Sequence, residues 1–266
     1  MNQEAQPDAP LLLQTRDAHG VVTLTLNRPR QFNALSEAML DALQRALEAI
    51  AVDESVRVVI LGGAGPAFCA GHDLKEMRAA PSLTYYQTLF AQCSRLMLTI
   101  QRLPQPVIAR VHGLATAAGC QLVAMCDLAV AADVARFAVS GINYGLFCAT
   151  PSVALGRNVS RKQAMEMLLT GEFIDANTAR ERGLVNRVVS LDKLDDELGA
   201  LARTICAKPA VAVAAGKGLF YRQLETGIEA AYQLAGQTMA CNMMAGDALE
   251  GVQAFIEKRP PHWSRD

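Results

Sequence analysis

The twenty residues from Gly113 to Ala132, GLATAAGCQLVAMCDLAVAA, constrain the fold more than any other segment because they contain a single charge. Their length is sufficient to cross a bilayer as a helix. Glycines, a glutamine and Asp127 interrupt the segment, however, and its apolar spacing changes from helical before Cys126 to strand-like after Asp127. The segment therefore predicts a buried helix followed by a buried strand, which requires a chain with a large core.

The chain is long and apolar enough to bury such a segment. It has 266 residues, of which 51% are apolar, and this composition excludes an intrinsically disordered protein. Its 25 Lys and Arg against 26 Asp and Glu give a net charge of -1, so no overall field attracts nucleic acid or an acidic membrane. We therefore expect one large α/β domain, with or without a small appendage, and no nucleic-acid or membrane partner.

Cysteine usage and the N-terminus bear on the cellular compartment. The seven cysteines are widely spaced and contain no C-x-x-C pair, a pattern typical of buried free thiols in a reducing compartment. The first ten residues, MNQEAQPDAP, lack the basic and apolar regions of a secretory leader and the arginines of a mitochondrial one. We therefore expect residues 1–10 to be a disordered tail and the protein to be cytoplasmic.

Apolar spacing along the rest of the chain predicts strands alternating with helices to about residue 150, followed by a largely helical third. Strands are expected over 21–27 and 56–61, and a helix is expected after Ser36, which is a good N-cap. A second long helix follows Pro81, and one late strand is expected over 184–189. This order is that of an α/β protein.

Several common catalytic signatures are absent from the sequence. There is no H-E-x-x-H, paired C-x-x-C, G-x-S-x-G or P-loop pattern. The four histidines are far apart along the chain: His19, His72, His112 and His262. We therefore predict no metal site and no permanently bound cofactor.

Two strand-to-turn junctions remain as candidates for chemistry. The first covers residues 68–74, and the second covers residues 112–120, where a strand gives way to a helix whose first N–H groups lack intrahelical partners. Two such N–H groups converging on one carbonyl oxygen form an oxyanion hole, and the helix dipole strengthens the second donor. Glycine-rich turns also serve purely geometric purposes, and periodicity alone leaves both interpretations open.

Five motifs, in order along the chain, resemble the enoyl-CoA hydratase/isomerase (crotonase) superfamily. They are N-R-P-x-x-x-N-A-L-S at 27–36, F-C-A-G-H-D-L-K-E at 68–76, P-V-I-A-x-V-H-G-x-A at 106–115, G-C-Q-L-x-x-x-C-D at 119–127 and F-x-E-K-R-x-P at 255–261. The resemblance implies a crotonase-like spiral of ββα units over residues 11–200 and a helical C-terminal trimerisation region over residues 201–266. It also implies a homotrimer or dimer of trimers that binds an acyl-CoA thioester.

The resemblance places the two hole donors on the N–H groups of His72 and Ala118. Hydratases of this family add water with two glutamates, but those positions here are Gln121 and Gly141, and the additional acid of the dienoyl-CoA isomerase branch is Ala149. Positioned acid–base groups each contribute roughly 10²–10⁴-fold to a rate. We therefore expect acyl-CoA binding and enolate stabilisation without efficient hydration.

The resemblance also suggests contacts to coenzyme A. Arg28 and Lys75 are candidates for its phosphates, and Phe255 and Lys258 are candidates for a neighbouring subunit's nucleotide. The alternative for each is an ordinary solvated surface group. The full set of predicted substrate-binding residues is Arg28, Ala70, His72, Asp73, Leu74, Lys75, Ala118, Phe255 and Lys258.

The His72 side chain has two interpretations. Either its ring is a surface group and only its backbone acts, or the ring binds a substrate carboxylate or thioester, since A-G-H-D resembles the methylmalonyl-CoA decarboxylase branch. That branch has a tyrosine where this chain has Cys148, a poor candidate nucleophile because no cationic partner would lower its pKa. Asp73 is expected to hold the loop, and Tyr144 is expected to be a core residue.

Three functions are therefore compatible with the sequence. The first is an enzyme of acyl-CoA enolate chemistry without the glutamate pair, with malonyl-type acyl-CoA esters as candidate substrates for decarboxylation. The second is a non-catalytic or regulatory protein that binds acyl-CoA. The third is a true enoyl-CoA hydratase that uses other groups, a reading that rests on family membership alone.

Overall fold

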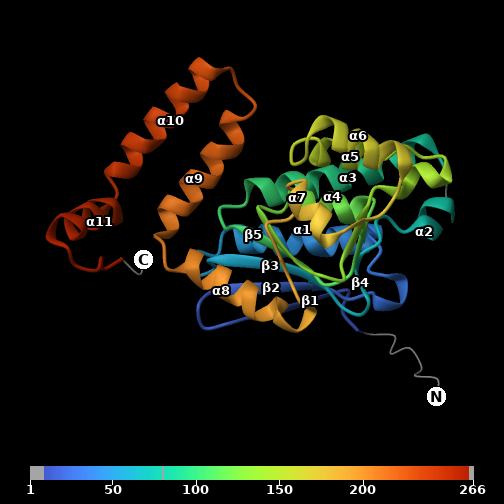
Figure 1. Cartoon of the computed structure of the whole chain (residues 1–266), viewed down its shortest axis with the longest axis horizontal. Coiled ribbons are helices and arrows are strands. Elements are labelled where there is room, and N and C mark those ends of the chain that lie inside the picture. The colour runs from blue at the N-terminus through green and yellow to red at the C-terminus, as the bar shows by residue number, and fades with distance from the viewer. Residues whose placement is uncertain (1–8, 80, 264–266) are drawn as a thin grey trace.

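The computed structural model of the chain describes residues 9–79 and 81–263, so the predicted tail over 1–10 lies, except for its last two residues, outside them. The described residues form a layered α/β core from which long helices project (Figure 1). The α/β class predicted from the alternating pattern is confirmed.

Two sheets form the core. The larger sheet has the strand order β1-β2-β3-β5-β7-β10, in which β1 is antiparallel to β2 and the other neighbours are parallel. Its strands are β1 (Leu12–Arg16), β2 (Val21–Leu26), β3 (Val58–Gly63), β5 (Val107–Val111), β7 (Leu128–Ala132) and β10 (Arg187–Val189). The smaller sheet, in order, contains β4 (Ala67–Cys69), β6 (Leu114–Thr116), β8 (Arg136–Ala138) and β9 (Ile174–Asp175).

From β3 to β8, consecutive strands alternate between the two sheets, and this alternation makes the core a spiral. The chain crosses from the larger to the smaller sheet between β3 and β4, between β5 and β6, and between β7 and β8. Helix α3 (Leu83–Arg102) follows β4, and helix α4 (Ala118–Met125) follows β6. Because β4 and β6 are parallel neighbours, the turns at their carboxyl ends meet at one edge of the smaller sheet.

Local sequence explains where the long core helices begin. The Ser36 hydroxyl accepts a hydrogen bond from the Met39 N–H at the start of α1 (Glu37–Ala51), and Ser82 caps α3 through the Tyr85 N–H. The remaining core helices are α2 (Leu74–Ala79), α5 (Ala149–Leu155), α6 (Arg161–Thr170), α7 (Ala176–Glu181) and α8 (Leu194–Cys206), with 3-10 turns at η1 (Pro29–Gln31), η2 (Ser140–Tyr144) and η3 (Leu191–Lys193).

The apolar segment from Gly113 to Ala132 is confirmed as a buried helix followed by a buried strand. It forms β6, α4 and β7, and seven of the eight residues of α4 are buried. No single helix among the described residues is long and apolar enough to span a membrane. Residues 191–206 and 210–223 pass that test only as a pair of helices bent by 102°.

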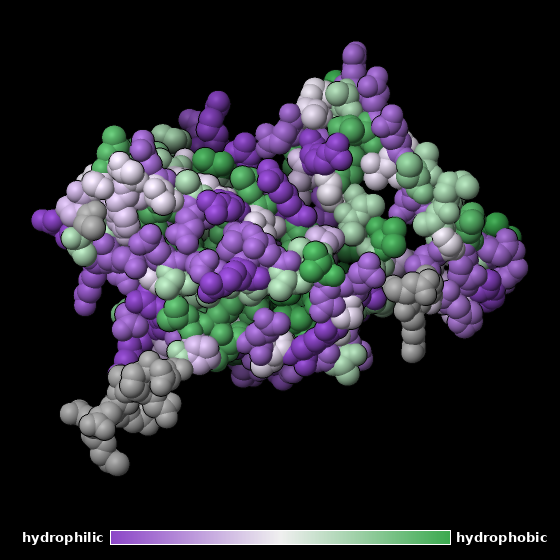
Figure 2. All heavy atoms as spheres, turned by 180° about the vertical axis from the view of Figure 1, so that it is seen from behind, coloured by the Kyte–Doolittle hydropathy of each residue, from purple (hydrophilic) through white to green (hydrophobic). Residues whose placement is uncertain are grey.

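The C-terminal helices pack differently from the core. Helix α8 lies against the larger sheet, so the predicted boundary at residue 200 falls inside a core helix, and the architecture changes near Pro209. Beyond it, α9 (Ala210–Gln223), α10 (Ile228–Met243) and α11 (Gly246–Glu257) project from the core (Figure 1). We call these three helices the arm. Exposed hydrophobic residues lie in patches along it (Figure 2).

A buried ion pair joins the arm to the core. Lys217 on α9 donates to the Asp127 carboxylate at 2.6 Å and to the main-chain oxygens of Ile100 and Gln105 at 2.9 and 3.0 Å. Asp127 also accepts from the Tyr221 hydroxyl at 2.9 Å. The side chains of Lys217 and Asp127 are only 7% and 13% exposed. All three ammonium protons are therefore used, and α9 is fixed where α3 ends and β7 begins.

Candidate active site

The first junction follows β4 and turns at Gly71, whose φ of +94° lies in the left-handed region that glycine tolerates. A parallel bridge ties it to Leu35: the Leu35 N–H donates to the Gly71 carbonyl at 2.8 Å, and the Asp73 N–H donates to the Leu35 carbonyl at 3.2 Å. The bridge uses the residues on either side of His72, so the His72 N–H points away from it. Within residues 9–79 and 81–263 no acceptor pairs with this N–H.

The second junction connects β6 to α4 through Ala117. This residue has φ +51° and ψ -121°, an uncommon conformation for a residue with a side chain. Its N–H donates to the Ala138 carbonyl at 3.0 Å, and its carbonyl accepts from the Gln121 N–H at 3.0 Å. The next residue, Ala118, begins α4, and its N–H has no partner in the described part of the chain.

The two junctions are in close contact. A side chain at Gly71 would lie 3.1 Å from the Ala118 nitrogen and 3.1 Å from the Thr116 oxygen. A side chain at Gly119 would overlap the main-chain carbonyl of Cys69. The fold therefore brings together the two residues that the sequence analysis selected, His72 and Ala118, each with an unpaired N–H. Two such donors beside a helix N-terminus are suited to a developing negative charge on oxygen.

Both ring nitrogens of His72 are buried, so the description of the ring as a surface group is wrong. The ring packs edge-on against Phe90 with the ring centroids 5.6 Å apart, and neither ring nitrogen has a hydrogen-bond partner among the described residues. Burial lowers the pKa of His72, and the Leu35 carbonyl opposes that shift without completing a hydrogen bond. The ring is therefore a neutral, unpartnered polar group on the same residue as the first N–H donor.

The positions of the two family glutamates differ in the space around them. Gln121 is 5% exposed, and its Oε1 has no hydrogen-bond partner within the described ranges. At Gly141 a Cβ would lie 2.6 Å from the Leu146 oxygen and 2.8 Å from the Cys148 sulfur, so no side chain fits without movement. Ala149, at the start of α5, is exposed. The first glutamate position therefore holds a neutral amide, and the second has no room for a side chain.

The segment after Gly141 supplies no strong acid, base or nucleophile. Burial raises the pKa of the Cys148 thiol, and a hydrogen bond from the Gly141 N–H at 3.3 Å opposes this shift only partly. A buried thiol of this kind is a poor nucleophile. The prediction that Tyr144 belongs to the core is wrong, because its side chain is 77% exposed at the end of η2. The physical reason is that η2 is a short turn at the surface, which leaves its last residue in solvent.

Arg28 and Asp73 hold the first junction in place. The Arg28 guanidinium donates to the Asp73 carboxylate at 2.9 Å and to the Ala34 carbonyl at 2.8 Å. Asp73 also accepts from the Lys75 N–H at 3.1 Å as α2 begins. Burial raises the pKa of Asp73, but the hydrogen bond and charge of Arg28 outweigh it and hold that pKa below its usual value. Arg28 is thus committed to the loop within this chain.

The other predicted coenzyme A contacts lie in two separate places. Leu74 and Lys75 are exposed on α2, close to the junctions, and Ala70 precedes Gly71 with its N–H bonded to the Phe32 carbonyl. Phe255 is 86% exposed on α11, and Lys258 caps the end of that helix. Helices α2 and α11 lie at opposite ends of the molecule (Figure 1). One chain therefore does not bring these two groups together.

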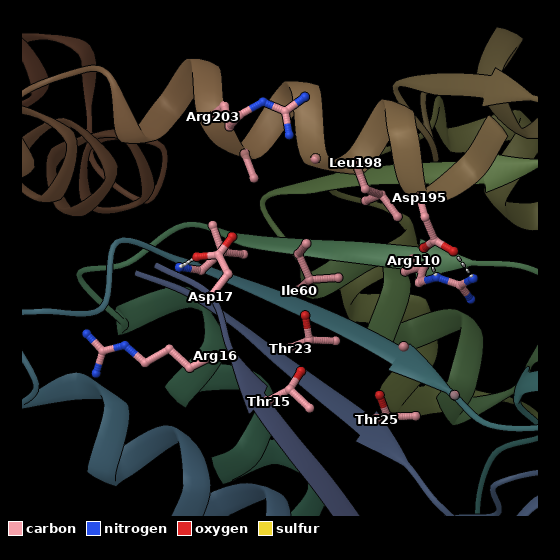
Figure 3. A pocket seen from close by; sticks show the side chains of 15 residues that line it. Thr15, Arg16, Asp17, Thr23, Thr25, Ile60, Arg110, Asp195, Leu198 and Arg203 are labelled. Carbon is pink, nitrogen blue, oxygen red and sulfur yellow. Dashed lines mark hydrogen bonds and ion pairs between the residues drawn. The ribbon is translucent and has the colours of Figure 1, made fainter. Parts of the chain in front are cut away.

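A separate cavity of about 450 Å³ lies between α8 and the larger sheet (Figure 3). Thr15, Thr23 and Thr25 line its sheet side, and Arg110 forms a bidentate pair with Asp195 at 2.6 and 2.9 Å. None of the residues selected from the sequence lines it. The only sequence pattern that could have indicated this cavity is the alternation of Thr23 and Thr25 within residues 21–25. The described residues hold no group of three or more His, Cys, Asp or Glu side chains arranged for a metal.

A spiral of two sheets, with the junctions after β4 and β6 in contact, is the arrangement of a crotonase-type protein. The family model described as enoyl-CoA hydratase/isomerase matches residues 16–266. A crystal structure of an enoyl-CoA hydratase from Mycobacterium smegmatis is 69% identical, with a TM-score of 0.95 over 96% of this chain and 99% of the other. The chain therefore belongs to the enoyl-CoA hydratase/isomerase family.

Vertebrate relatives are also similar to this chain. Enoyl-CoA hydratase domain-containing protein 3 from Rattus norvegicus is 47% identical over 96% of this chain and 85% of its own length. The crystal structure of the human protein of that name is 44% identical, with a TM-score of 0.92 over 96% of this chain and all of the other. The crotonase-like fold class predicted from the motifs is confirmed.

The prediction of a cytoplasmic protein is wrong. It is contradicted by the names of relatives from Rattus norvegicus, Mus musculus, Danio rerio and Homo sapiens, which are all named as mitochondrial proteins. Free thiols indicate a reducing compartment but do not distinguish one such compartment from another. Seven free cysteines therefore do not distinguish the cytoplasm from another reducing compartment.

Proposed function

We propose that the protein binds an acyl-CoA thioester with its carbonyl oxygen between the N–H groups of His72 and Ala118. The observation that carries this proposal is the contact of the two junctions, with the Gly71 side-chain position 3.1 Å from the Ala118 nitrogen and no partner for either N–H in the described residues. Both donors belong to the backbone, so they do not depend on the identity of the side chains that this chain has replaced.

The same two donors stabilise an enolate better than a ground-state carbonyl. When electron density from the α carbon moves onto the thioester oxygen, that oxygen becomes negative, and donors already fixed in place need no reorganisation. The N-terminus of α4 adds its partial positive charge. Loss of one comparable donor in other enzymes costs about 3–4 kcal/mol of transition-state stabilisation. Enolate chemistry is therefore the reaction class that this arrangement supports best.

Efficient hydration of an enoyl-CoA is not part of this proposal. Gln121 cannot exchange a proton near neutral pH, and the closed space at Gly141 excludes a second carboxylate. We expect butyryl-CoA to bind, as measured by calorimetry, while crotonyl-CoA is hydrated far below the roughly 10³ s⁻¹ at the upper end of typical turnover numbers. A turnover number near that value would contradict the proposal.

The buried His72 ring favours decarboxylation of a malonyl-type CoA ester as a second candidate reaction. Loss of CO₂ breaks the bond between the α carbon and the carboxylate and leaves its electron pair as the thioester enolate, which then takes a proton from solvent. No base is needed to remove a carbon-bound proton. His72→Ala keeps the N–H and deletes the ring, so CO₂ release should fall in this variant. Equal release by both proteins would reject a role for the ring, and release by neither would leave acyl-CoA binding without catalysis.

We also propose that the protein is a homotrimer or a dimer of trimers. Support comes from the arm, where hydrophobic side chains such as Met239, Met244 and Ile256 are more than 60% exposed. Helices with this composition are common at subunit interfaces. Sedimentation velocity at micromolar concentration should show a trimer or hexamer, and a monomer would contradict the proposal.

A further inference from the structure

Ala117 is held in a conformation that a residue with a side chain disfavours. Its φ of +51° and ψ of -121° are reached without penalty by glycine, whereas an alanine methyl crowds the backbone there. Hydrogen bonds on both sides keep it in place, because its N–H donates to Ala138 and its carbonyl accepts from Gln121. Strain that the surroundings enforce in this way is characteristic of functional sites.

The methyl group of Ala117 lies between the two junctions. The side-chain position of Gly71 is 2.9 Å from the Ala117 Cβ, closer than it is to the Ala118 nitrogen at 3.1 Å. Gly71 has no Cβ of its own, so the alanine methyl is the side-chain group that fills this contact. It lies beside Gly71, the residue that precedes the His72 N–H, and its own residue precedes the Ala118 N–H.

We infer that Ala117 is a positioning residue whose methyl group sets the spacing of the His72 and Ala118 N–H groups. This inference rests on the proposed function, since it concerns the same oxyanion hole. A glycine at position 117 would adopt this backbone conformation without strain. The contact between residues 71 and 117 would then have no side chain on either side, and the two junctions could move relative to each other. The methyl group thus lowers the stability of the folded protein through backbone strain, but it fixes the positions of the two N–H donors.

The test compares two ligands that differ only at the thioester oxygen: butyryl-CoA and S-butyl-CoA, a thioether without the carbonyl. In the unaltered protein we expect butyryl-CoA to bind about tenfold more tightly, as for about one net hydrogen bond. In Ala117→Gly we expect this preference to fall at least threefold, without a fall in melting temperature, because the backbone strain is relieved. Ala117→Ser, which keeps the Cβ, should retain the preference.

A matched control and three outcomes make the test decisive. Ala18→Gly makes the same substitution in an exposed turn between β1 and β2 and should leave the preference unchanged. An unchanged preference in Ala117→Gly, or an equal loss in Ala117→Ser, would overturn the inference while leaving the proposed function intact. If the unaltered protein binds both ligands equally or neither, the proposed function itself fails.

Discussion

The surroundings of the glycines differ between the core and the arm. In the core, a Cβ at Gly113 or Gly119 would overlap a main-chain carbonyl, of Pro66 in one case and of Cys69 in the other. In the arm, Gly216, Gly218 and Gly236 have nothing within 4 Å of the position that a Cβ would take. Glycine in the core allows backbones to approach closely, and this approach builds the candidate hole. At these three positions of the arm, glycine serves no packing purpose within one chain.

The two regions also differ in how they are stabilised. The core buries the apolar stripes of α1 and α3, whereas α9 has no buried apolar residue and α10 and α11 have one each. The arm is tied to the core by the buried Lys217–Asp127 pair and by the Tyr221 hydroxyl, which donates to the same carboxylate. The geometry of the site thus depends on packing within the core, whereas the arm is attached locally and exposes apolar side chains such as Met239 and Phe255.

The largest expected effect comes from breaking that attachment. Lys217→Met leaves the buried Asp127 carboxylate without its charge partner and should lower the free energy of unfolding by about 3–5 kcal/mol. Hydrogen exchange should show the loss of protection concentrated in α9. Urea unfolding of Lys208→Met, which alters an exposed lysine in the same region, should differ from the unaltered protein by under about 0.5 kcal/mol. Equal effects of the two substitutions would contradict the attachment.

The two kinds of glycine give a matched pair of substitutions. Gly119→Ala forces a methyl group against Cys69 and should destabilise the protein by about 1–3 kcal/mol or more while weakening acyl-CoA binding. Gly236→Ala, in the open middle of α10, should instead stabilise the protein by about 0.5–1 kcal/mol. Urea unfolding and calorimetry measure both. The contrast between the regions would be lost if both substitutions acted in the same direction.

A smaller effect is expected from pH. Burial lowers the pKa of His72 in the folded protein, so the unfolded chain binds the proton more readily. The stability that His72 contributes is therefore present above its ordinary pKa of about 6.5 and is lost as the pH falls below that value. His72→Gln should reduce the loss of stability between pH 7.5 and 5.5, whereas His19→Gln, at an exposed histidine, should not. Identical pH dependence in both variants would contradict the buried, unpartnered ring.

The smallest effect is expected in the arm. Phe255 is 86% exposed, so Phe255→Ala should change the free energy of unfolding by under about 0.5 kcal/mol at a concentration where the chain is monomeric. At micromolar concentration the same substitution should shift sedimentation towards smaller species if the arm forms the subunit interface. A loss of more than about 2 kcal/mol in the monomer would show that the arm packs on its own core.

The sequence predicted the features of the fold that depend on local residue patterns. The apolar segment from Gly113 to Ala132, the cap at Ser36 and the two junctions follow from spacing and residue type, and the structure places them as expected. Partners distant in the chain were not predictable: Lys217 and Asp127 are 90 residues apart, and Arg28 and Asp73 are 45 apart. Ring burial at His72 and the exposure of Tyr144 likewise depend on tertiary packing. The same holds for α8, which lies on the sheet across the expected boundary at residue 200.

The most direct measurement of the central claim is a crystal structure of the protein with butyryl-CoA bound. We expect the thioester oxygen within about 3.1 Å of both the His72 and the Ala118 main-chain nitrogens, with the acyl chain directed towards Gln121. A thioester carbonyl that contacts neither nitrogen, or a coenzyme A bound in the cavity beneath α8, would contradict it.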